Sequence, residues 1–216
     1  MQNSKELANI VLGIEAVKFN PETPFTWASG YRMPVYNDNR LLMGNAKHRM
    51  MIAQGFRSIL EKLQTKTEVV AGTATAGIAP AATLADLIQT PLIYVRPAPK
   101  SHGLGNQIEG ILKKGQSVIV VEDLVSTGSS SLKAIEAVRK AGGIVEHCLC
   151  IFTYGFQKSF DMFEQAHCQI HPLLTLETLI DCAKDSGTLN NNQILLLKSW
   201  QEDPFTWGTR HGFQKA

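Results

Sequence analysis

Several features that would place the chain in a special class are missing from its 216 residues. No apolar run approaches the ~20 residues that a membrane-spanning helix needs. The formal net charge is only +2, too small to predict a general nucleic-acid or membrane binder, so any basic site must be a local cluster. In the first 19 residues, apolar side chains recur every three to four positions and charged residues stand between them. This pattern predicts an amphipathic helix and not a signal peptide. We therefore expect a cytoplasmic protein with no nucleic-acid or membrane partner.

Cysteine is scarce, with four residues in all, and no CxxC pair or Cys/His spacing typical of a metal site occurs. Cys148 and Cys150 alternate along an apolar run and are expected to point to the same face. The pattern predicts reduced, buried thiols. The Gly-Lys-Ser/Thr sequence of a Walker loop is also missing, as are repeats of solenoid length and low-complexity linkers.

Short aliphatic runs alternate with amphipathic segments along most of the chain. The runs predict buried strands at 68–72, 91–95, 117–121 and 144–152. The segments between them predict helices at 45–64, 77–89 and 129–141. This alternation indicates one α/β domain with a central, mostly parallel sheet flanked by helices. Residues 20–44 are rich in turn formers with a weak strand near 33–37, and the chain after about Ser186 predicts one helix and a polar tail.

The stretch VIVVEDLVSTGSSS, residues 118–131, carries the most chemistry. A strand that finishes on Glu122 and Asp123 delivers both acids to the carboxyl edge of the sheet, where ligands of open parallel sheets bind. The hydroxyl-rich turn and the unpaired amides of the next helix can hold a phosphate, and Gly128 lets the backbone close around it. Ionised carboxylates accept hydrogen bonds from vicinal hydroxyls. A ribose-5-phosphate site therefore explains this order better than two surface charges beside an ordinary helix cap.

This stretch resembles the signature of type I phosphoribosyltransferases, which transfer a ribosyl phosphate from phosphoribosyl pyrophosphate (PRPP) to a nitrogenous base, usually with Mg²⁺. The resemblance implies that family's fold as a single domain over residues 1–216. Residues 1–44 would hold the N-terminal helix and an acceptor-base hood, 45–185 the α/β core and 186–216 a C-terminal extension. It also implies that Mg²⁺ is carried mainly by PRPP, without a protein metal site. PRPP would be bound by Glu122, Asp123, Leu124, Val125, Ser126, Thr127, Gly128, Ser129 and Ser130.

The segment YVRPAPKSHGLGNQIEG, residues 94–110, resembles the mobile loop of the orotate-specific branch of the family. The resemblance implies that Arg96, Lys100 and His102 bind the pyrophosphate of PRPP, and that Lys100 is catalytic together with Glu122 and Asp123. In the family this loop reaches the neighbouring subunit's active site, which implies a homodimer with shared sites. The chain departs from the family at Pro97, often a second lysine, and at Ser101, usually an acid. We expect fewer pyrophosphate contacts and a stiffer start to the loop.

Two further segments resemble the same branch. Residues 25–40 resemble the part that packs over the acceptor base, and Lys18, just upstream, matches the family's position for a lysine near the base. The resemblance implies orotate binding by Lys18, Tyr36 and Arg40, with Ser126 of the signature stretch also touching the base. A lone lysine such as Lys18 is otherwise a solvated helix residue. Residues 69–85 resemble the second phosphate-side loop.

Two positions depart from the pattern of other members. Ala76 stands where some members have a lysine. Tyr154 lies in a stretch where others place a base-contacting arginine, and either substitutes for it or packs in the core.

These segments together predict transfer of ribosyl phosphate from PRPP to orotate. Two alternatives stay open from the sequence. One is a phosphoribosyltransferase for a purine or uracil. The other is a non-catalytic regulator that senses PRPP on the same fold and binds nucleic acid, which would need a basic face or an added DNA-binding segment.

Overall fold

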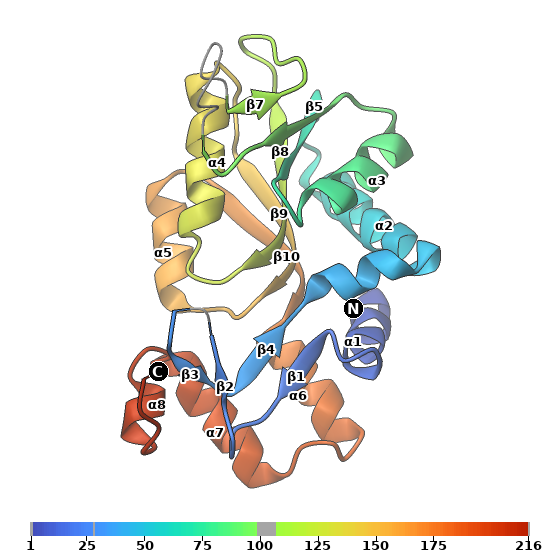
Figure 1. Cartoon of the computed structure of the whole chain (residues 1–216). Helices are drawn as coiled ribbons and strands as arrows, with labels where there is room; N and C mark the ends of the chain where they lie inside the picture. The colour runs from blue at the N-terminus through green and yellow to red at the C-terminus, as the bar shows by residue number, and fades with distance from the viewer. Residues whose placement is uncertain (1, 28, 99–106, 216) are drawn as a thin grey trace.

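The computed structural model describes residues 2–27, 29–98 and 107–215. A six-stranded sheet lies between two layers of helices, with a smaller region at one end (Figure 1). The strand order is β10-β9-β8-β5-β6-β7, in which β7 is antiparallel to β6 and all other neighbours are parallel. The strands are β5 (Val69–Thr73), β6 (Leu92–Val95), β7 (Ile108–Glu109), β8 (Val118–Val125), β9 (His147–Thr153) and β10 (Gln169–Thr175). The expected α/β class with a mostly parallel sheet is confirmed.

Each face of the sheet is covered by its own set of helices, because the buried strands carry apolar side chains on both faces. The helices α1 (Gln2–Gly13), α2 (Ala46–Leu63) and α3 (Ile78–Ile88) pack into one core, and α4 (Ser129–Lys140) and α5 (Gln157–Gln165) pack into the other. Along β9, Leu149 and Ile151 belong to the first core, whereas Cys148 and Cys150 belong to the second. All four cysteines are free and buried, as expected.

The expected core strands and helices agree with the observed ones to within a few residues, with two corrections. The strand β8 does not finish at the acids but runs through them to Val125, because Glu122 and Leu124 still pair with β9. The N-terminal helix ends at Gly13, earlier than expected, because Val17–Phe19 forms the strand β1. The sequence analysis did not anticipate β10, α5 or α6 (Leu176–Asp185).

The hood, residues 17–44, consists of short antiparallel pairs and a 3₁₀ helix. The strand β1 pairs with β4 (Val35–Asn37), and β2 (Phe25–Thr26) pairs with β3 (Arg32–Met33). The 3₁₀ helix η1 (Asn39–Gly44) then leads from the hood into α2. The hood is therefore attached to the core just where η1 passes the end of β8.

The C-terminal extension is more ordered than expected, since it forms the two helices α7 (Asn191–Glu202) and α8 (Trp207–Arg210) beside the hood (Figure 1). Trp200 and Trp207 are completely buried, and the Trp200 indole nitrogen lies 3.0 Å from the Met33 sulfur. The expected polar tail is thus wrong for this segment. Its two tryptophans complete the apolar core beneath the hood.

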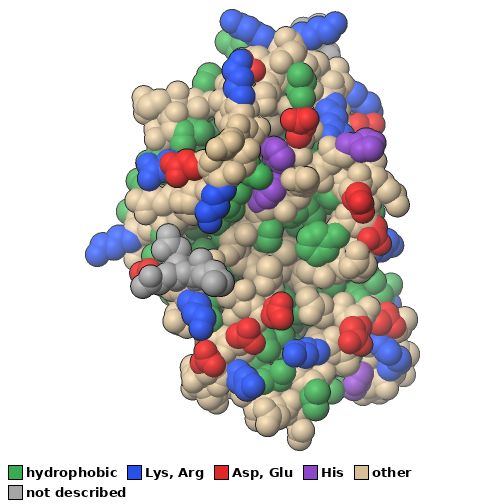
Figure 2. All heavy atoms as spheres, turned by 180° about the vertical axis from the view of Figure 1, so that it is seen from behind, with side chains coloured by type: hydrophobic (Ala, Val, Ile, Leu, Met, Phe, Trp, Pro, Cys, Tyr) green, Lys and Arg blue, Asp and Glu red, His purple; other side chains and the backbone are tan. Residues whose placement is uncertain are grey.

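Within the described residues no helix combines the length and the apolar character needed to cross a bilayer. On the face of the molecule shown in Figure 2, acidic and basic side chains are interspersed and do not form an extended patch of one sign. This mixture agrees with the small net charge of the chain.

Candidate active site at the carboxyl end of β8

The turn between β8 and α4 is shaped to receive an anion. Gly128 precedes the helix with a φ of +85°, and no side chain caps the first turn of α4. The first amides of this 12-residue helix are therefore free of a side-chain acceptor and can donate to a bound phosphate. A Cβ at position 128 would lie 2.8 Å from a ring carbon of Phe163. Glycine is thus required both by the backbone conformation and by the packing of α5 beneath the turn.

A cavity of about 480 Å³ opens beside this turn. It brings together five of the residues expected to bind PRPP: Arg96, Glu122, Thr127, Ser129 and Ser130. Lys133, which the sequence analysis missed, also lines it. Lys133 follows Ser129 by four positions and so lies on the same face of α4, a spacing that would have identified it. The cavity is thus lined by hydroxyl groups, the N-terminus of α4 and the cationic side chains of Arg96 and Lys133. It is large enough for a phosphorylated sugar.

Arg96 is half-buried at the end of β6, and its guanidinium is 3.5 Å from the Glu109 carboxylate on β7. Pro97, the residue that departs from the family pattern, is exposed and lines the same cavity. Lys100, Ser101 and His102 lie outside the described residues. The expected role of Lys100 and His102 in holding pyrophosphate therefore stays a prediction.

Glu122 is buried, with 7% of its surface exposed, and its carboxylate is fully engaged. One oxygen accepts from the Thr73 hydroxyl at 2.7 Å and from the Asp123 amide at 3.1 Å, and the other accepts from the Ser131 hydroxyl at 3.0 Å. Burial first, and then the neighbouring Asp123 carboxyl, together raise the pKa of Glu122 to about 7, against the opposing effect of the Thr73 hydrogen bond. Glu122 therefore ties β5, β8 and α4 together beneath the phosphate turn.

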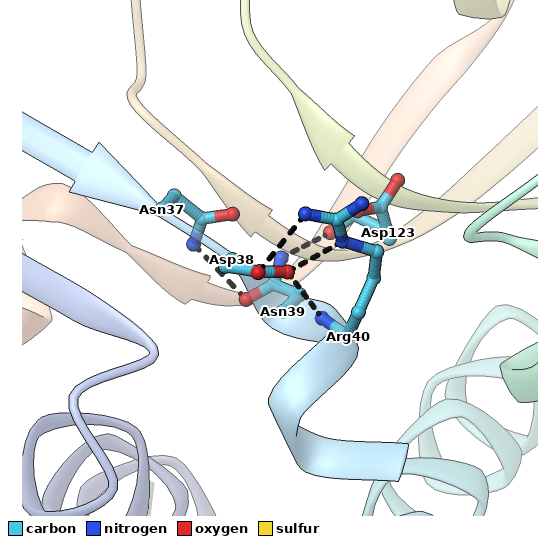
Figure 3. A network of polar contacts seen from close by, with 5 residues as sticks. All are labelled: Asn37, Asp38, Asn39, Arg40 and Asp123. Atoms are coloured by element: carbon cyan, nitrogen blue, oxygen red, sulfur yellow. Dashed lines mark hydrogen bonds and ion pairs between the residues drawn. The ribbon is translucent and has the colours of Figure 1, made fainter.

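Asp123 is half-buried and faces the hood. Its backbone carbonyl accepts a hydrogen bond from the side-chain amide of Asn39, at 2.7 Å, and the Arg40 guanidinium lies beside its carboxylate (Figure 3). The pKa of Arg40 is raised first by its hydrogen bond to Asp38 and in smaller part by the charge of Asp123. The two adjacent acids thus have different surroundings, one enclosed by the core and one open toward the hood.

Lys18 and Tyr36, both expected to bind orotate, lie directly opposite each other on β1 and β4. Opposed residues of an antiparallel pair project from the same face, so the two side chains are neighbours. Lys18 belongs to a strand and not to the N-terminal helix, and its ammonium lies 2.6 Å from the Glu15 carboxylate. Tyr36 is 41% exposed, and its ring centre is 5.7 Å from that of Phe25.

The remaining predicted contacts separate into two groups. Ala76 lines a small cavity together with Arg40, Arg49 and Asp123, next to the hood. Tyr154 is buried with 1% exposure and stacks on Phe156, so it takes the core-packing role of the two considered. Asn39, Thr73 and Ser131 are the supporting side chains that the sequence analysis missed. No local signal identifies them, because each acts through a partner that is distant in the sequence or buried.

Comparisons with known proteins agree on one family. Residues 45–162 match the family model described as the phosphoribosyl transferase domain. The orotate phosphoribosyltransferase of Listeria innocua is 44% identical over 208 residues, which cover 96% of this chain and 100% of that protein. The crystal structure of orotate phosphoribosyltransferase from Aeropyrum pernix superposes with a TM-score of 0.73 at 30% identity, covering 85% of this chain and 99% of that one. Leishmania donovani UMP synthase superposes with a TM-score of 0.77 at 26% identity, covering 92% of this chain but only 42% of that one.

Proposed function

The chain belongs to the phosphoribosyl transferase family and, within it, to the orotate phosphoribosyltransferases. We propose that PRPP binds on one side of the carboxyl end of β8, beside α4, and that orotate binds on the other side, beneath the hood. The enzyme transfers the ribosyl phosphate of PRPP to orotate, giving orotidine 5′-monophosphate and pyrophosphate in pyrimidine biosynthesis. In this step a bond forms between a ring nitrogen of orotate and the anomeric carbon. The bond from that carbon to pyrophosphate breaks, pyrophosphate leaves with the electron pair, and the ring nitrogen releases its proton to solvent.

The donor side is proposed to be the cavity beside α4. The amides after Gly128 and the hydroxyls of Thr127, Ser129 and Ser130 would hold the 5′-phosphate. Leu124 and Val125, the last residues of β8, and Ser126, which begins the turn, would complete the donor site, with Ser126 also touching the base. Arg96, with Lys100 and His102 of the partner subunit's loop, would neutralise the departing pyrophosphate. The single observation that carries this assignment is the shared cavity of the phosphate turn, Arg96 and Glu122.

The acceptor side is proposed to be the space between Asp123 and the hood. Asp123, at the boundary between the two sides, would accept hydrogen bonds from the ribose hydroxyls of PRPP. Its negative charge would stabilise the positive charge that develops at the anomeric carbon. Lys18, Tyr36 and Arg40 would meet the anionic pyrimidine from the hood. Glu122 would support this arrangement through its contacts with Thr73 and Ser131.

Magnesium is proposed to enter the site on the pyrophosphate and ribose oxygens of PRPP. In the described ranges, no three His, Cys, Asp or Glu side chains come together as a protein-held metal site would require. The carboxylate of Asp123 could join the ion there, in keeping with the preference of Mg²⁺ for one or two carboxylates, substrate phosphates and water. When bound, the ion would offset charge on the leaving pyrophosphate.

The proposed function is tested by the loss of orotate absorbance when PRPP and Mg²⁺ are added to the purified protein. Orotate should disappear only with both additions, and the product should be orotidine 5′-monophosphate. Adenine, hypoxanthine, guanine and uracil serve as competing acceptors. Nucleotide formation with one of these bases at the expense of orotate would contradict the proposal.

A homodimer in the cytoplasm, with the loop around Lys100 reaching the partner's site, is proposed from the family pattern. Lys100→Ala and Asp123→Ala should each be inactive alone. Mixed heterodimers should regain activity, because one site then receives an intact loop and an intact acid. Verified heterodimers without activity would show that the loop serves its own subunit.

A further inference from the structure

Asn39 joins two parts of the site that lie 84 residues apart in the sequence. It is the first residue of η1 and is buried with 2% exposure. Its side-chain nitrogen donates to the backbone carbonyl of Asp123 at 2.7 Å, and its oxygen accepts from the Asn37 side chain at 3.0 Å (Figure 3). Because both the nitrogen and the oxygen of this buried amide are hydrogen-bonded, the Asn39 side chain makes a short and directional link between the hood and β8.

The Asp123 carbonyl fixes the direction of the link. Because a backbone carbonyl can only accept, the Asn39 nitrogen must face Asp123, which leaves the Asn39 oxygen to accept from the Asn37 amide. An inverted amide would bring two donors together at Asn37 and two acceptors together at Asp123. The hydrogen-bond pattern therefore allows only one orientation of this side chain.

The residues on either side of Asn39 hold the same segment in place. The backbone amide of Asp38 donates to the Ala16 carbonyl at 2.7 Å, which ties the segment to the chain before β1. The Asp38 carboxylate accepts from the Arg40 side chain at 2.6 and 3.0 Å and from the Arg40 amide at 3.2 Å. Its hydrogen bond with Arg40 holds the pKa of Asp38 below the ordinary value. The Asn39 side chain thus projects from a well-anchored turn.

Resting on the proposed function, we propose that Asn39 is a positioning residue that fixes the distance between the hood and the ribose-binding end of β8. The hood would carry the base and Asp123 would carry the ribose, so their separation sets the gap across which the new bond forms. Reacting atoms must approach to about 3–3.5 Å, and a misplacement of about 1 Å can lower the rate by about 100-fold. Asn39 touches neither substrate in this arrangement.

A positioning role predicts a specific kinetic pattern. PRPP lies on the donor side and orotate on the acceptor side, so each should bind almost normally when the link is broken. Orotidine 5′-monophosphate spans both sides, as the transition state does, and should bind more weakly. If Asn39 only stabilised the fold, its replacement would instead lower the melting temperature and change the affinities for all three ligands by the same factor.

The test compares Asn39→Asp with the control Asn45→Asp. Asn39→Asp keeps the size of the side chain but replaces the donor with an acceptor facing the Asp123 carbonyl. Asn45 is exposed, six positions further along, and caps α2 by accepting from the Lys47 amide, a role that aspartate also fills. Asn39→Ser is a second, uncharged variant that is too short to bridge to Asp123. All three are assayed below their melting temperatures, alongside the wild type.

We expect kcat to fall about 10- to 100-fold in both Asn39 variants. Orotidine 5′-monophosphate should bind less tightly by a similar factor, with the KM values of PRPP and orotate changed less than about 3-fold. The kcat of Asn39→Asp relative to wild type should rise as the pH falls from 8 to 6, because the introduced carboxyl group can again donate once it is protonated. Asn45→Asp should match the wild type throughout.

Three results would overturn the proposal: a wild-type kcat in both Asn39 variants, an equal loss of affinity for all three ligands, or a kcat change that follows the melting temperature alone. Failure of the wild type to use orotate would instead reject the proposed function. The two failures are thus distinguishable.

Discussion

Replacing Glu122 with glutamine is expected to stabilise the ligand-free protein at pH 8, and the gain should vanish toward pH 5. Burial raises the pKa of Glu122 from an ordinary 4.5 to about 7, with Asp123 adding to the effect. Between these values the folded chain keeps a proton that the unfolded chain has released. The stability that depends on this proton is fully present below pH 4.5 and is lost as the pH rises through about 7.

The size of the effect follows from proton linkage. A change of one unit in pKa corresponds to about 1.4 kcal/mol, and the loss between pH 5 and pH 8 amounts to about 2.5 kcal/mol. Glutamine keeps the length of the side chain and an oxygen for the Asp123 amide and the Thr73 hydroxyl, while its nitrogen can donate to the Ser131 hydroxyl. The variant should therefore gain up to ~5–10 °C in Tm relative to wild type at pH 8.

The assay is urea unfolding of both proteins at pH 5, 6, 7 and 8 without ligands. The difference between the two proteins is the informative quantity, because other titrating groups contribute equally to both. His171 is such a group: burial lowers its pKa to about 4, so its contribution grows with rising pH and opposes that of Glu122. A difference in unfolding free energy that stays constant from pH 5 to pH 8 would refute the reasoning.

Three other substitutions follow from burial and backbone conformation. Gly128→Ala should raise the KM of PRPP and lower stability more than the control Gly115→Ala. Both glycines have a φ of +85°, but only at position 128 would the added Cβ press against Phe163. Equal effects of the two substitutions on Tm and KM would contradict this. Trp200→Ala should cost about 3–5 kcal/mol in chemical denaturation, because a completely buried indole is removed; a cost below about 1 kcal/mol would show that the extension does not complete the core. His171→Gln should raise Tm relative to wild type at pH 5 more than at pH 8, because the imidazole must stay neutral in the fold; a gain independent of pH would argue against this.

The central sheet could be predicted because its signals are local. The run VIVV in β8 is apolar on both faces, as a strand covered on both sides must be. The strand β10 was missed because its sequence QIHPLLT contains Pro172 and His171 and is only partly buried. Proline is tolerated there because β10 is the edge strand of the sheet. Edge strands have one unpaired side and so depart most from the buried pattern.

The C-terminal extension illustrates a different limit. Trp200 and Trp207 stand among polar residues in the sequence, which suggested an irregular tail. The burial of Trp200 depends on the hood, where Trp27 and Met33 supply the other half of the contact. An amphipathic helix whose partner lies more than 150 residues earlier gives little local indication of where its apolar face is covered.

The candidate site divides in the same way between local and distant causes. The turn between β8 and α4 could be predicted, because acids, hydroxyls, Gly128 and the start of α4 follow one another along the chain. The sequence shows Glu122 and Asp123 as two similar carboxylates, and only the fold distinguishes them. Thr73 encloses the first from 49 positions away, and Asn39 holds the backbone of the second from 84 positions away. Adjacent residues of one strand thus acquire different surroundings, one enclosed by the core and one open toward the hood, through contacts that no local pattern records.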